Sequence, residues 1–482
     1  MSNYFITTSI PYVNGEPHLG HAMEFVMADV LARRARLRGD NVIFSMGSDE
    51  HGGKIAEKAE ELGLKPKELA DQMSKSFSDL AENLNISNDR FIRTTDEGHE
   101  QRAALIWKAL KDDIYKAKYI GWYCTGDEAF FSDTEVKANN GVCPNHNRPY
   151  DKIEEENYFF KLSKYTQPVL DAIESGDFLI VPETKRNEIL NVIKDGLDDI
   201  SISRPAAKIG WGIPIPGDKK QTMYVWFEAL MNYITVLGYP EHEDFKSHWP
   251  AQVQVIGKDI IRFHAAIWPA MLMSLNIGLP KMLYVHSFVN VNGKKMSKSL
   301  GNYVSPTDVI DKYGADAFRY YFLRHVPSYN DGDFTWESFD TAYNSELANE
   351  LGNAVQRTAA MIDKYQEGLI GELPLVQHDI AQYEEALDLC RFDRALDEVW
   401  EQVRGLNQYI DQEKPWMIAK DGDGGHLQEV LAYQVGSLVN IAKLLEPFLP
   451  DTAAKIAAVF VGKKVQPITG TLFPKLEEPL VQ

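Results

Sequence analysis

The alternation of apolar and polar residues predicts a parallel sheet near the start of the chain. Residues 4–9 are β-branched or aromatic, a turn-forming PYVNGEP follows, and apolar residues recur at helical spacing from Leu19 to about Arg38. Further strands are expected from Asn41 and Asp89. Strands that alternate with helices are typical of a parallel sheet covered on both faces, whose ligands bind beyond the carboxyl ends of the strands.

The pattern changes twice farther along the chain. Between about Tyr115 and Gly217, aromatic residues, turns and short strands predict an inserted subdomain; strand patterns return at Met223, Val253 and Met282, and helical spacing dominates from Asn344. We expect an α/β fold: a Rossmann-like parallel-sheet catalytic domain split by an insertion, followed by an all-α C-terminal bundle. The predicted division is 1–114 and 218–292 for the two halves of the catalytic domain, 115–217 for the insertion, 293–343 for a lysine-rich loop and the region after it, and 344–482 for the bundle.

Composition narrows the class of protein. The chain has 482 residues, 44% of them hydrophobic and 25% charged, which is ordinary for a folded enzyme of two or three domains. No secretory signal or long apolar stretch is present in the sequence and there are only three cysteines, so we expect a cytoplasmic protein without a membrane span.

The formal charge of −20 argues against a uniformly basic, RNA-binding surface. Local clusters change this expectation: Arg33, Arg34, Arg36 and Arg38 share one helical stretch, and Lys294, Lys295 and Lys298 share one loop. These clusters are either basic patches on an acidic body or solvated surface charges.

Two short motifs suggest phosphate chemistry. His18, Gly20 and His21 stand where a loop enters a helix, so backbone N–H groups and two imidazoles face any bound anion. Far downstream, KKMSKS follows Asn292 and Gly293, and its lysines could close over a triphosphate. Taken alone, the histidines could be structural and the lysines solvated.

Together HLGH and KMSKS resemble the two signatures of class I aminoacyl-tRNA synthetases. The segments SIPYVNGEPHLGH, GSDEHG, LSISRP, YVWFEALMNY, IGKDIIRFHAAIWPAM and VNGKKMSKSLGN are similar, in this order, to methionyl-tRNA synthetase motifs. The resemblance implies ATP-dependent activation of L-methionine, with Mg²⁺, and transfer of the methionyl group to the terminal adenosine of tRNA(Met). It also implies that His18, His21, Lys295 and Lys298 are catalytic and that Gly20 and Ser297 contact ATP.

The same resemblance assigns a methionine pocket. An unbranched thioether suits a deformable, aromatic-lined cavity with a polar tip. Asp49 is expected to pair with the substrate ammonium and Arg204 to support it, whereas Glu228 replaces an expected aspartate and receives no catalytic role. Without the motifs, the aromatic residues would be assigned to core packing and Asp49 to a helix cap. The implied pocket residues are Ile10, Tyr12, Trp226, Ala229, Leu230, Tyr233, His264 and Trp268.

The insertion contains a metal-knuckle spacing. Cys124 with Asp127, and Cys143 with His146, are each separated by two residues, and members of the family often carry four cysteines, or cysteines and a histidine, here. Zinc accepts carboxylate oxygen, although structural sites prefer sulfur and nitrogen. The four residues therefore either hold Zn²⁺ or are two buried thiols with a surface histidine. Cys390 is expected in the core of a helix.

The helical end is implied to read the anticodon. Asn353 and Arg357 are four residues apart on one helical face, and Trp416 follows a proline; all three match anticodon-contacting positions of the family. Their alternative roles are a helix cap, a surface charge and core packing. Because no further tRNA-binding module follows, we expect a monomer.

Two rival functions remain at this stage. One is a class I synthetase for valine, isoleucine, leucine or cysteine, although the insertion is shorter than the editing domains of the large aliphatic enzymes. The other is a tRNA-binding paralogue that has lost catalysis.

Overall fold

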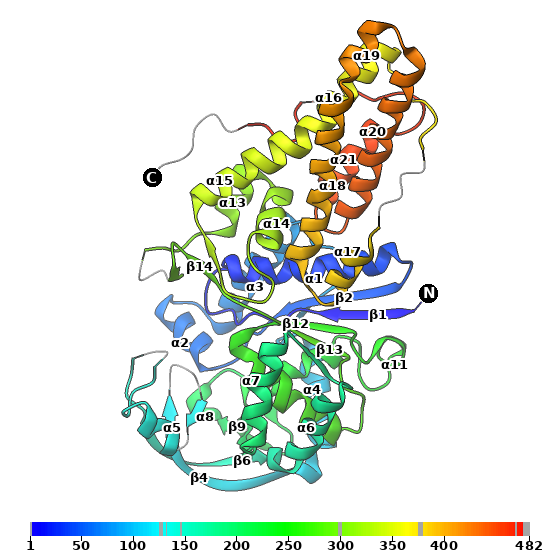
Figure 1. Cartoon of the computed structure of the whole chain (residues 1–482). Helices are drawn as coiled ribbons and strands as arrows, with labels where there is room; N and C mark the ends of the chain where they lie inside the picture. Colours follow the sequence, from blue (N-terminus) through cyan, green and yellow to red (C-terminus); the bar gives the residue numbers. More distant parts are fainter. Residues whose placement is uncertain are drawn as a thin grey trace.

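Six parallel strands form the central sheet of the protein. In this computed structural model, which describes residues 2–124, 129–131, 133–144, 147–296, 301–374, 379–467 and 470–475, the strand order is β3-β2-β1-β12-β13-β7 (Figure 1). All neighbouring pairs are parallel. The strands are β1 (Asn3–Thr7), β2 (Asn41–Ser48), β3 (Arg90–Arg93), β7 (Leu179–Val181), β12 (Val253–Gly257) and β13 (Met282–His286).

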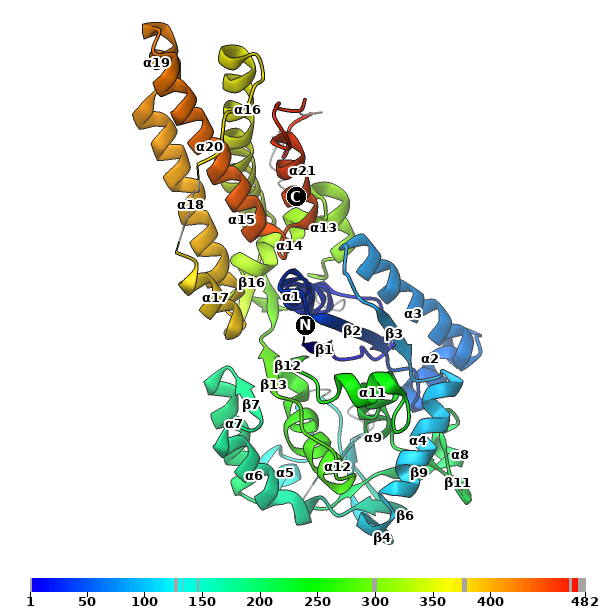
Figure 2. The same ribbon diagram turned by 90° about the vertical axis from the view of Figure 1, so that its right-hand side faces the viewer.

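Both faces of the sheet are buried, which explains why inner strands such as β12 and β13 are mostly apolar. In β13, Leu283 and Val285 belong to one hydrophobic core and Tyr284 to the other, as the two-residue period of a strand requires. The first face is covered by α4 (Glu97–Ala109) and α12 (Trp268–Ser274), and the second by α1 (Leu19–Leu37) and α3 (Pro66–Asn83). Figure 2 shows α1 end-on above the strands.

The strand order reverses between β1 and β12. The chain proceeds from β1 to β2 and β3 on one side, and from β12 to β13 on the other, so the loops after β1 and β12 diverge. Ligands of open α/β sheets bind at such a reversal. The segment after β1 leads to His18, and Asp49 directly follows β2. An isolated parallel bridge between Tyr12 and Asp49 holds these two segments side by side.

The insertion is smaller than predicted. It forms an antiparallel sheet of β5 (Ala129–Phe131), β4 (Ile114–Cys124), β6 (Asp151–Phe160) and β8 (Ile200–Ser201). However, β7 lies within the predicted 115–217 range and is the edge strand of the central sheet, between α6 (Thr166–Ser175) and α7 (Glu183–Lys194). Short strands of the two sheets have the same sequence pattern. Only the observed strand pairing therefore shows that β7 belongs to the central sheet.

The strand predicted from Met223 is wrong. Strand β11 (Asp218–Met223) ends there, and α9 (Val225–Leu230) begins two residues later. A short apolar run does not distinguish a buried strand from a buried helical turn. The remaining small elements are α2 (Gly53–Glu61), α5 (Asp133–Ala138), α8 (Ala206–Ile209), α10 (Asn232–Thr235), α11 (Glu243–His248), β9 (Ser203–Pro205), β10 (Pro214–Ile215), β14 (Val289–Val291), β15 (Lys294–Lys295) and β16 (Gly332–Phe334).

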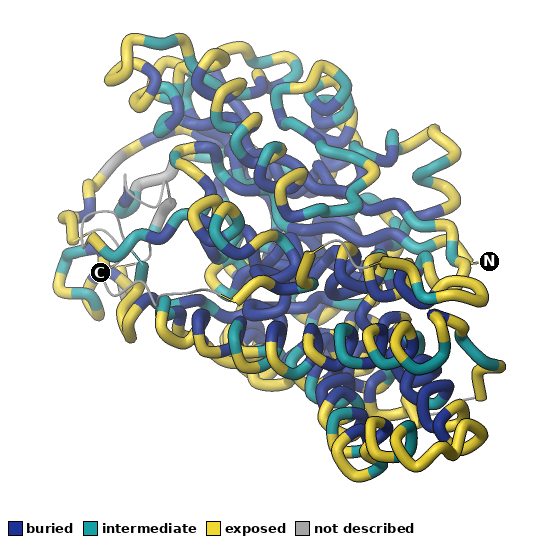
Figure 3. Tube along the Cα trace, turned by 90° about the horizontal axis from the view of Figure 1, so that it is seen from above, coloured by how far each residue is buried: buried dark blue, intermediate teal, exposed yellow. Residues whose placement is uncertain are grey.

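Helices make up the C-terminal part, as predicted. They extend away from the sheet, on the side opposite the inserted sheet, with α19 at the far tip (Figure 1). Buried residues run continuously from the sheet into these helices, while their outer turns are exposed (Figure 3). The helices are α13 (Pro306–Tyr313), α14 (Ala315–Arg324), α15 (Trp336–Ala342), a π-helical segment (Tyr343–Gly352), α16 (Asn353–Gln366), α17 (Ala381–Asp388), α18 (Phe392–Glu413), α19 (Pro415–Asp421), α20 (Gly424–Leu445) and α21 (Pro450–Val459).

The four arginines at the end of α1 do not form an open basic patch, because each one pairs with a carboxylate. Arg34 contacts Glu384 and Asp388 at 2.6 Å each, from the far side of the domain boundary. The other three arginines are also paired, Arg33 with Asp29, Arg36 with Asp89 and Arg38 with Glu384. Arg34 and Arg38 therefore join the catalytic domain to α17, whereas Arg33 and Arg36 pair within the catalytic domain.

Cys390 is buried, as expected, but it lies at the turn between α17 and α18 with a positive φ of 54°. Within the described ranges, none of the helices combines the length and the hydrophobicity needed to cross a membrane.

Candidate active site

The two histidines of HLGH form a stacked pair at the start of α1. Their ring centroids are 3.6 Å apart, and His18 is the N-cap residue of the helix. The backbone N–H of His21 donates to His18 Nδ1 at 3.3 Å, and the backbone N–H of His18 donates to His21 Nδ1 at 3.2 Å. Gly20 leaves room for the His18 ring, because a Cβ atom there would make a tight contact of 3.0 Å with His18 Cε1.

This reciprocal capping fixes the chemistry of both rings. Burial lowers the pKa of His18 to about 4 and lowers that of His21 well below its ordinary value, so both imidazoles are neutral near pH 7. Since each Nδ1 accepts a hydrogen bond, each ring carries its proton on Nε2. The two Nε2–H groups are thus the donors that the pair can offer to an anion at the helix N-terminus.

The segment that follows KMSKS contacts the loop that leads into this pair. Tyr303, just after KMSKS, donates from its hydroxyl to the carbonyl of Pro17 at 2.7 Å, so two segments 286 residues apart meet. Lys294 and Lys295 form β15, which pairs with β14 across a turn at Asn292 and Gly293. The first part of the predicted lysine-rich loop is therefore a hairpin; Ser297 and Lys298 lie outside the described residues.

Aromatic residues gather in the hydrophobic core against which Tyr12 of the β1 loop packs. The Tyr233 hydroxyl is 2.7 Å from His264 Nε2, and the Trp268 ring lies 5.8 Å from the Tyr233 ring. His264 Nδ1–H donates to the Ile260 carbonyl at 3.0 Å and burial lowers the His264 pKa to about 4, so Nε2 of a neutral ring accepts from Tyr233. These residues are almost completely buried.

Other predicted pocket residues extend this cluster. Trp226 stacks on Phe263 with centroids 4.2 Å apart, and Leu230 shares the core of Tyr233 and Trp268. Tyr12 packs against the same core, and Ala229 is buried on α9. Ile10 lies next to Gly47 on β2, since a Cβ atom at Gly47 would meet the Ile10 side chain at 2.9 Å.

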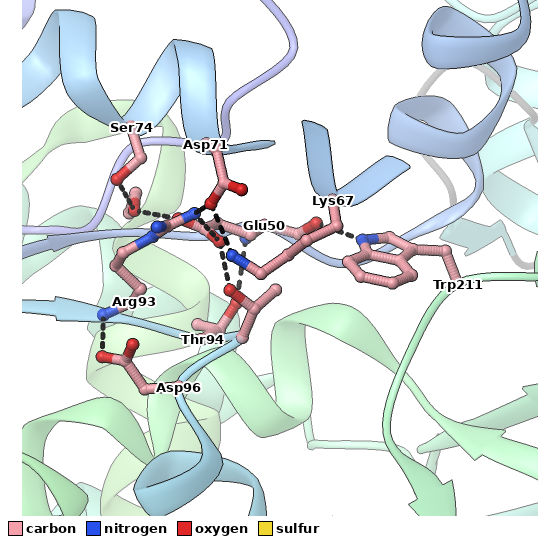
Figure 4. A network of polar contacts seen from close by, with 10 residues as sticks. Glu50, Lys67, Asp71, Ser74, Arg93, Thr94, Asp96 and Trp211 are labelled. Atoms are coloured by element: carbon pink, nitrogen blue, oxygen red, sulfur yellow. Dashed lines mark hydrogen bonds and ion pairs between the residues drawn. The ribbon is translucent and has the colours of Figure 1, made fainter. Parts of the chain in front are cut away.

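Three consecutive buried charges follow β2: Asp49, Glu50 and His51. Glu50 is fully buried and accepts from Arg93 Nε at 2.6 Å and Nη2 at 2.9 Å, and the Trp211 indole N–H donates to its carbonyl at 2.6 Å (Figure 4). Asp49 is held by its backbone: its N–H donates to the Pro11 carbonyl, and its own carbonyl accepts from Val13. These two bonds fix the Asp49 backbone beside the loop that follows β1.

His51 is the third charge, and its ionisation can be tested. Burial opposes its positive charge, but the Glu228 carboxylate, 2.8 Å from Nδ1, raises the pKa of His51 from 6.5 to about 10. Because the folded state holds this proton more tightly, the resulting stabilisation is fully present below pH 6.5 and is lost as the pH rises through about 10. Urea unfolding should show that His51→Gln is most destabilising at the lower pH and that the difference from the wild type shrinks towards pH 10. Parallel stability curves would contradict this assignment.

Arg204 lies across a small hollow from the same segment. Gly52, Gly53, Trp211 and Tyr224 line this hollow together with Arg204. The guanidinium carbon lies 4.3 Å from the centre of the Tyr224 ring, and Nη1 donates to the Ser203 carbonyl at 2.7 Å. Arg204 is therefore part of the wall around the SDEHG segment.

Comparison with known proteins agrees with this geometry. Residues 4–152 and 147–359 match the protein family described as tRNA synthetases class I (M). The chain is 44% identical over 470 residues to the methionine–tRNA ligase of Caldanaerobacter subterraneus subsp. tengcongensis, covering 94% of this chain and 73% of that protein. A methionine–tRNA ligase of Brucella melitensis biotype 1 is 42% identical over 475 residues, covering 95% and 92%.

The chain belongs to the methionyl-tRNA synthetase family. Its fold agrees: a methionyl-tRNA synthetase of Mycobacterium tuberculosis in complex with methionyl-adenylate superposes with a TM-score of 0.92 at 37% identity, over 98% of this chain and 100% of that one.

The predicted anticodon residues of this family member lie on α16 and α19. The Arg357 guanidinium is 5.8 Å from the centre of the Trp416 ring and pairs with Asp411 at 3.0 Å. Trp416 is 39% exposed although it is large and aromatic, and Asn353 is exposed one turn before Arg357. Core packing is therefore excluded for Trp416.

The cysteines of the insertion lie together. Cys124 and Cys143 are buried in one small cluster with Val136 and Tyr150. Asp127 and His146 lie outside the described residues, and within the described part of the chain no group of three or more potential metal ligands is found.

Several site residues carried no assigned role in the sequence. Glu228 and His51 were visible only as members of longer motifs, and His99 had no motif around it. Arg93 and Tyr303 likewise act on residues far away in sequence. Their polar side chains are the only indication of a role in the local sequence, because the residues that they contact lie on other elements.

Proposed function

We propose that the crevice at the β1/β12 reversal performs both steps of methionine–tRNA ligation. The carrying observation is the meeting of the HLGH loop with the segment after KMSKS, next to a buried aromatic cluster and a carboxylate. The first step needs three features within one crevice: hydrogen-bond donors to the phosphate oxygens, a carboxylate for the substrate ammonium, and a pocket for the thioether. No side-chain nucleophile is required, because positioning and electrostatics suffice for such transfers.

The first step activates methionine. A methionine carboxylate oxygen attacks the α-phosphorus of ATP, the bond from that phosphorus to the bridging oxygen breaks, and pyrophosphate leaves. His18 and His21 donate their Nε2–H groups to the phosphate oxygens as charge builds up, and Mg²⁺, brought with ATP, shares that charge. Lys295 and Lys298 are assigned to the departing pyrophosphate, with Gly20 and Ser297 as further ATP contacts.

Asp49 binds the methionine ammonium, and the aromatic cluster binds the side chain. The Tyr233–His264 hydrogen bond supplies a polar tip for the thioether, while Ile10, Tyr12, Trp226, Ala229, Leu230 and Trp268 line the rest. In the second step, a ribose hydroxyl of the terminal tRNA adenosine attacks the methionyl carbonyl and AMP leaves.

Amino-acid-dependent exchange of pyrophosphate into ATP tests this function. L-Methionine should support exchange, whereas valine, isoleucine, leucine and cysteine should support much less. A faster rate with another amino acid would favour a different class I specificity. Binding of tRNA without any exchange would favour a paralogue without catalysis.

Anticodon reading is part of the proposal. Stacking on an aromatic residue contributes about 1–3 kcal/mol per base, so Trp416→Ala should lower tRNA(Met) aminoacylation by about 5- to 150-fold. Methionine-dependent exchange should stay unchanged, because it needs no tRNA. Met417→Ala is the matched control, because this neighbour is similarly exposed, at 43%. A loss of exchange in the Trp416 variant would contradict the role.

We also propose that Cys124, Asp127, Cys143 and His146 hold Zn²⁺, supported by two buried thiols in one cluster. Metal analysis of purified protein and of Cys143→Ser tests this. The chain is further proposed to act as a monomer in the cytoplasm, which gel filtration and cell fractionation test.

A further inference from the structure

One buried carboxylate joins three elements around the proposed methionine site. Glu228 on α9 is completely buried, and each of its oxygens faces a different imidazole: Oε1 lies 2.8 Å from His51 Nδ1 and Oε2 lies 2.9 Å from His99 Nε2. Burial raises the pKa of the Glu228 carboxyl, but the charge and hydrogen bonds of His51 and His99 outweigh it and the pKa lies below its ordinary value. The carboxylate is thus charged, paired and fixed at both oxygens.

These partners come from the two halves of the site. His51 is two residues after Asp49, which is assigned to the substrate ammonium. Glu228 stands on the six-residue helix α9, between residues assigned to the substrate side chain. A helix this short is not stable by itself, so its position depends on tertiary contacts. The Glu228–His51 contact is such a contact, and it joins α9 directly to the segment that carries Asp49.

His99 holds the same region from α4. Its Nε2 contacts Glu228, and its Nδ1 is 2.8 Å from Thr235 Oγ1 on α10. Glu228 and Thr235 enclose the stretch that contains Ala229, Leu230 and Tyr233. One imidazole therefore fixes both ends of the segment that lines the thioether site.

We propose that Glu228, through His51 and His99, is a positioning residue that sets the distance between the ammonium site at Asp49 and the thioether site at Tyr233. This inference rests on the proposed function. The inference gives a role to Glu228, which stands where the family resemblance leads us to expect the shorter aspartate. A ligand that contacts both sites senses this distance, whereas a ligand that contacts only one does not.

Two inhibitors of methionine-dependent exchange separate these cases. L-Methioninol carries both the ammonium and the thioether, and 4-(methylthio)butan-1-ol carries only the thioether. Glu228→Gln keeps the shape but removes the charge, so it should raise the KM for methionine and the Ki for methioninol by about 10-fold, as expected when a charged buried hydrogen bond is lost. The KM for ATP and the Ki for 4-(methylthio)butan-1-ol should change by less than about 2-fold.

Thr235→Val provides a second variant if Glu228→Gln does not fold. It removes only the Oγ1 partner of His99 and should raise the methioninol Ki by about 3-fold, in the same selective way. Glu346→Gln is the matched control, because Glu346 also pairs with a histidine, His325 at 2.7 Å, outside the site. It should leave both Ki values unchanged.

Two outcomes would overturn the inference. Equal weakening of both inhibitors would mean that Glu228 only supports the packing of α9, and unchanged constants for both would remove its role altogether. Failure of the proposed function would look different, because the wild-type protein itself would then show no methionine-dependent exchange.

Discussion

Replacing His21 by alanine should lower the rate of methionine-dependent pyrophosphate exchange by about 10²- to 10³-fold, the usual loss when one preorganised donor to a developing charge is removed. The physical reason is that His21 donates from a neutral Nε2–H, held in place because its Nδ1 accepts the backbone N–H of His18. The KM for methionine should change little, because the imidazole is proposed to donate to phosphate oxygens of ATP and not to contact methionine. Steady-state exchange kinetics measure both quantities.

The tautomer gives this prediction a matched control. In His21→Gln the side-chain amide nitrogen occupies the ε position, so it can replace Nε2–H in part, whereas in His21→Asn the amide nitrogen is at the δ position and cannot. We expect activity in the order wild type, Gln, then Asn and Ala together. If Asn restored more activity than Gln, the donor would be Nδ1 and the assigned tautomer would be wrong.

Asp49→Asn should reduce kcat/KM for methionine by roughly 150- to 5,000-fold, with the KM for ATP nearly unchanged. Asp49 is 3% exposed, and removing one partner of a buried ion pair costs about 3–5 kcal/mol because the other charge is left uncompensated. The ammonium of methionine would be that charge. Exchange kinetics with methionine and ATP varied separately provide the measurement.

Asp89→Asn is the control for Asp49. Asp89 pairs with Arg36 at 2.7 Å and accepts from the backbone of Phe44 at 2.8 Å, so its loss should reduce stability but not methionine affinity. Equal effects of both variants on the KM for methionine would show that Asp49 is a structural carboxylate.

Most of the sheet could be predicted from the sequence, because its buried strands are short runs of apolar residues between turns. β1, β2, β3, β12 and β13 are observed where strands were expected. The strand predicted at Met223 failed because an aromatic run of that length fits a buried helical turn equally well. The role of the arginines near the end of α1 could not be predicted for another reason. A local run of charges does not show that Glu384 and Asp388 lie opposite Arg34.

The sequence by itself indicated a class I synthetase, through HLGH and KMSKS, and the methionyl-tRNA synthetase family, through six segments in their order. It also gave the chemical type of each side chain assigned to the site. Only the tertiary structure decided what those residues can do. The tautomers of His18 and His21 depend on reciprocal backbone contacts, and the charge of His51 depends on Glu228, which is 177 residues away. Hydrogen-bond partners and burial set protonation states, and both arise from packing between distant segments, which no local pattern encodes.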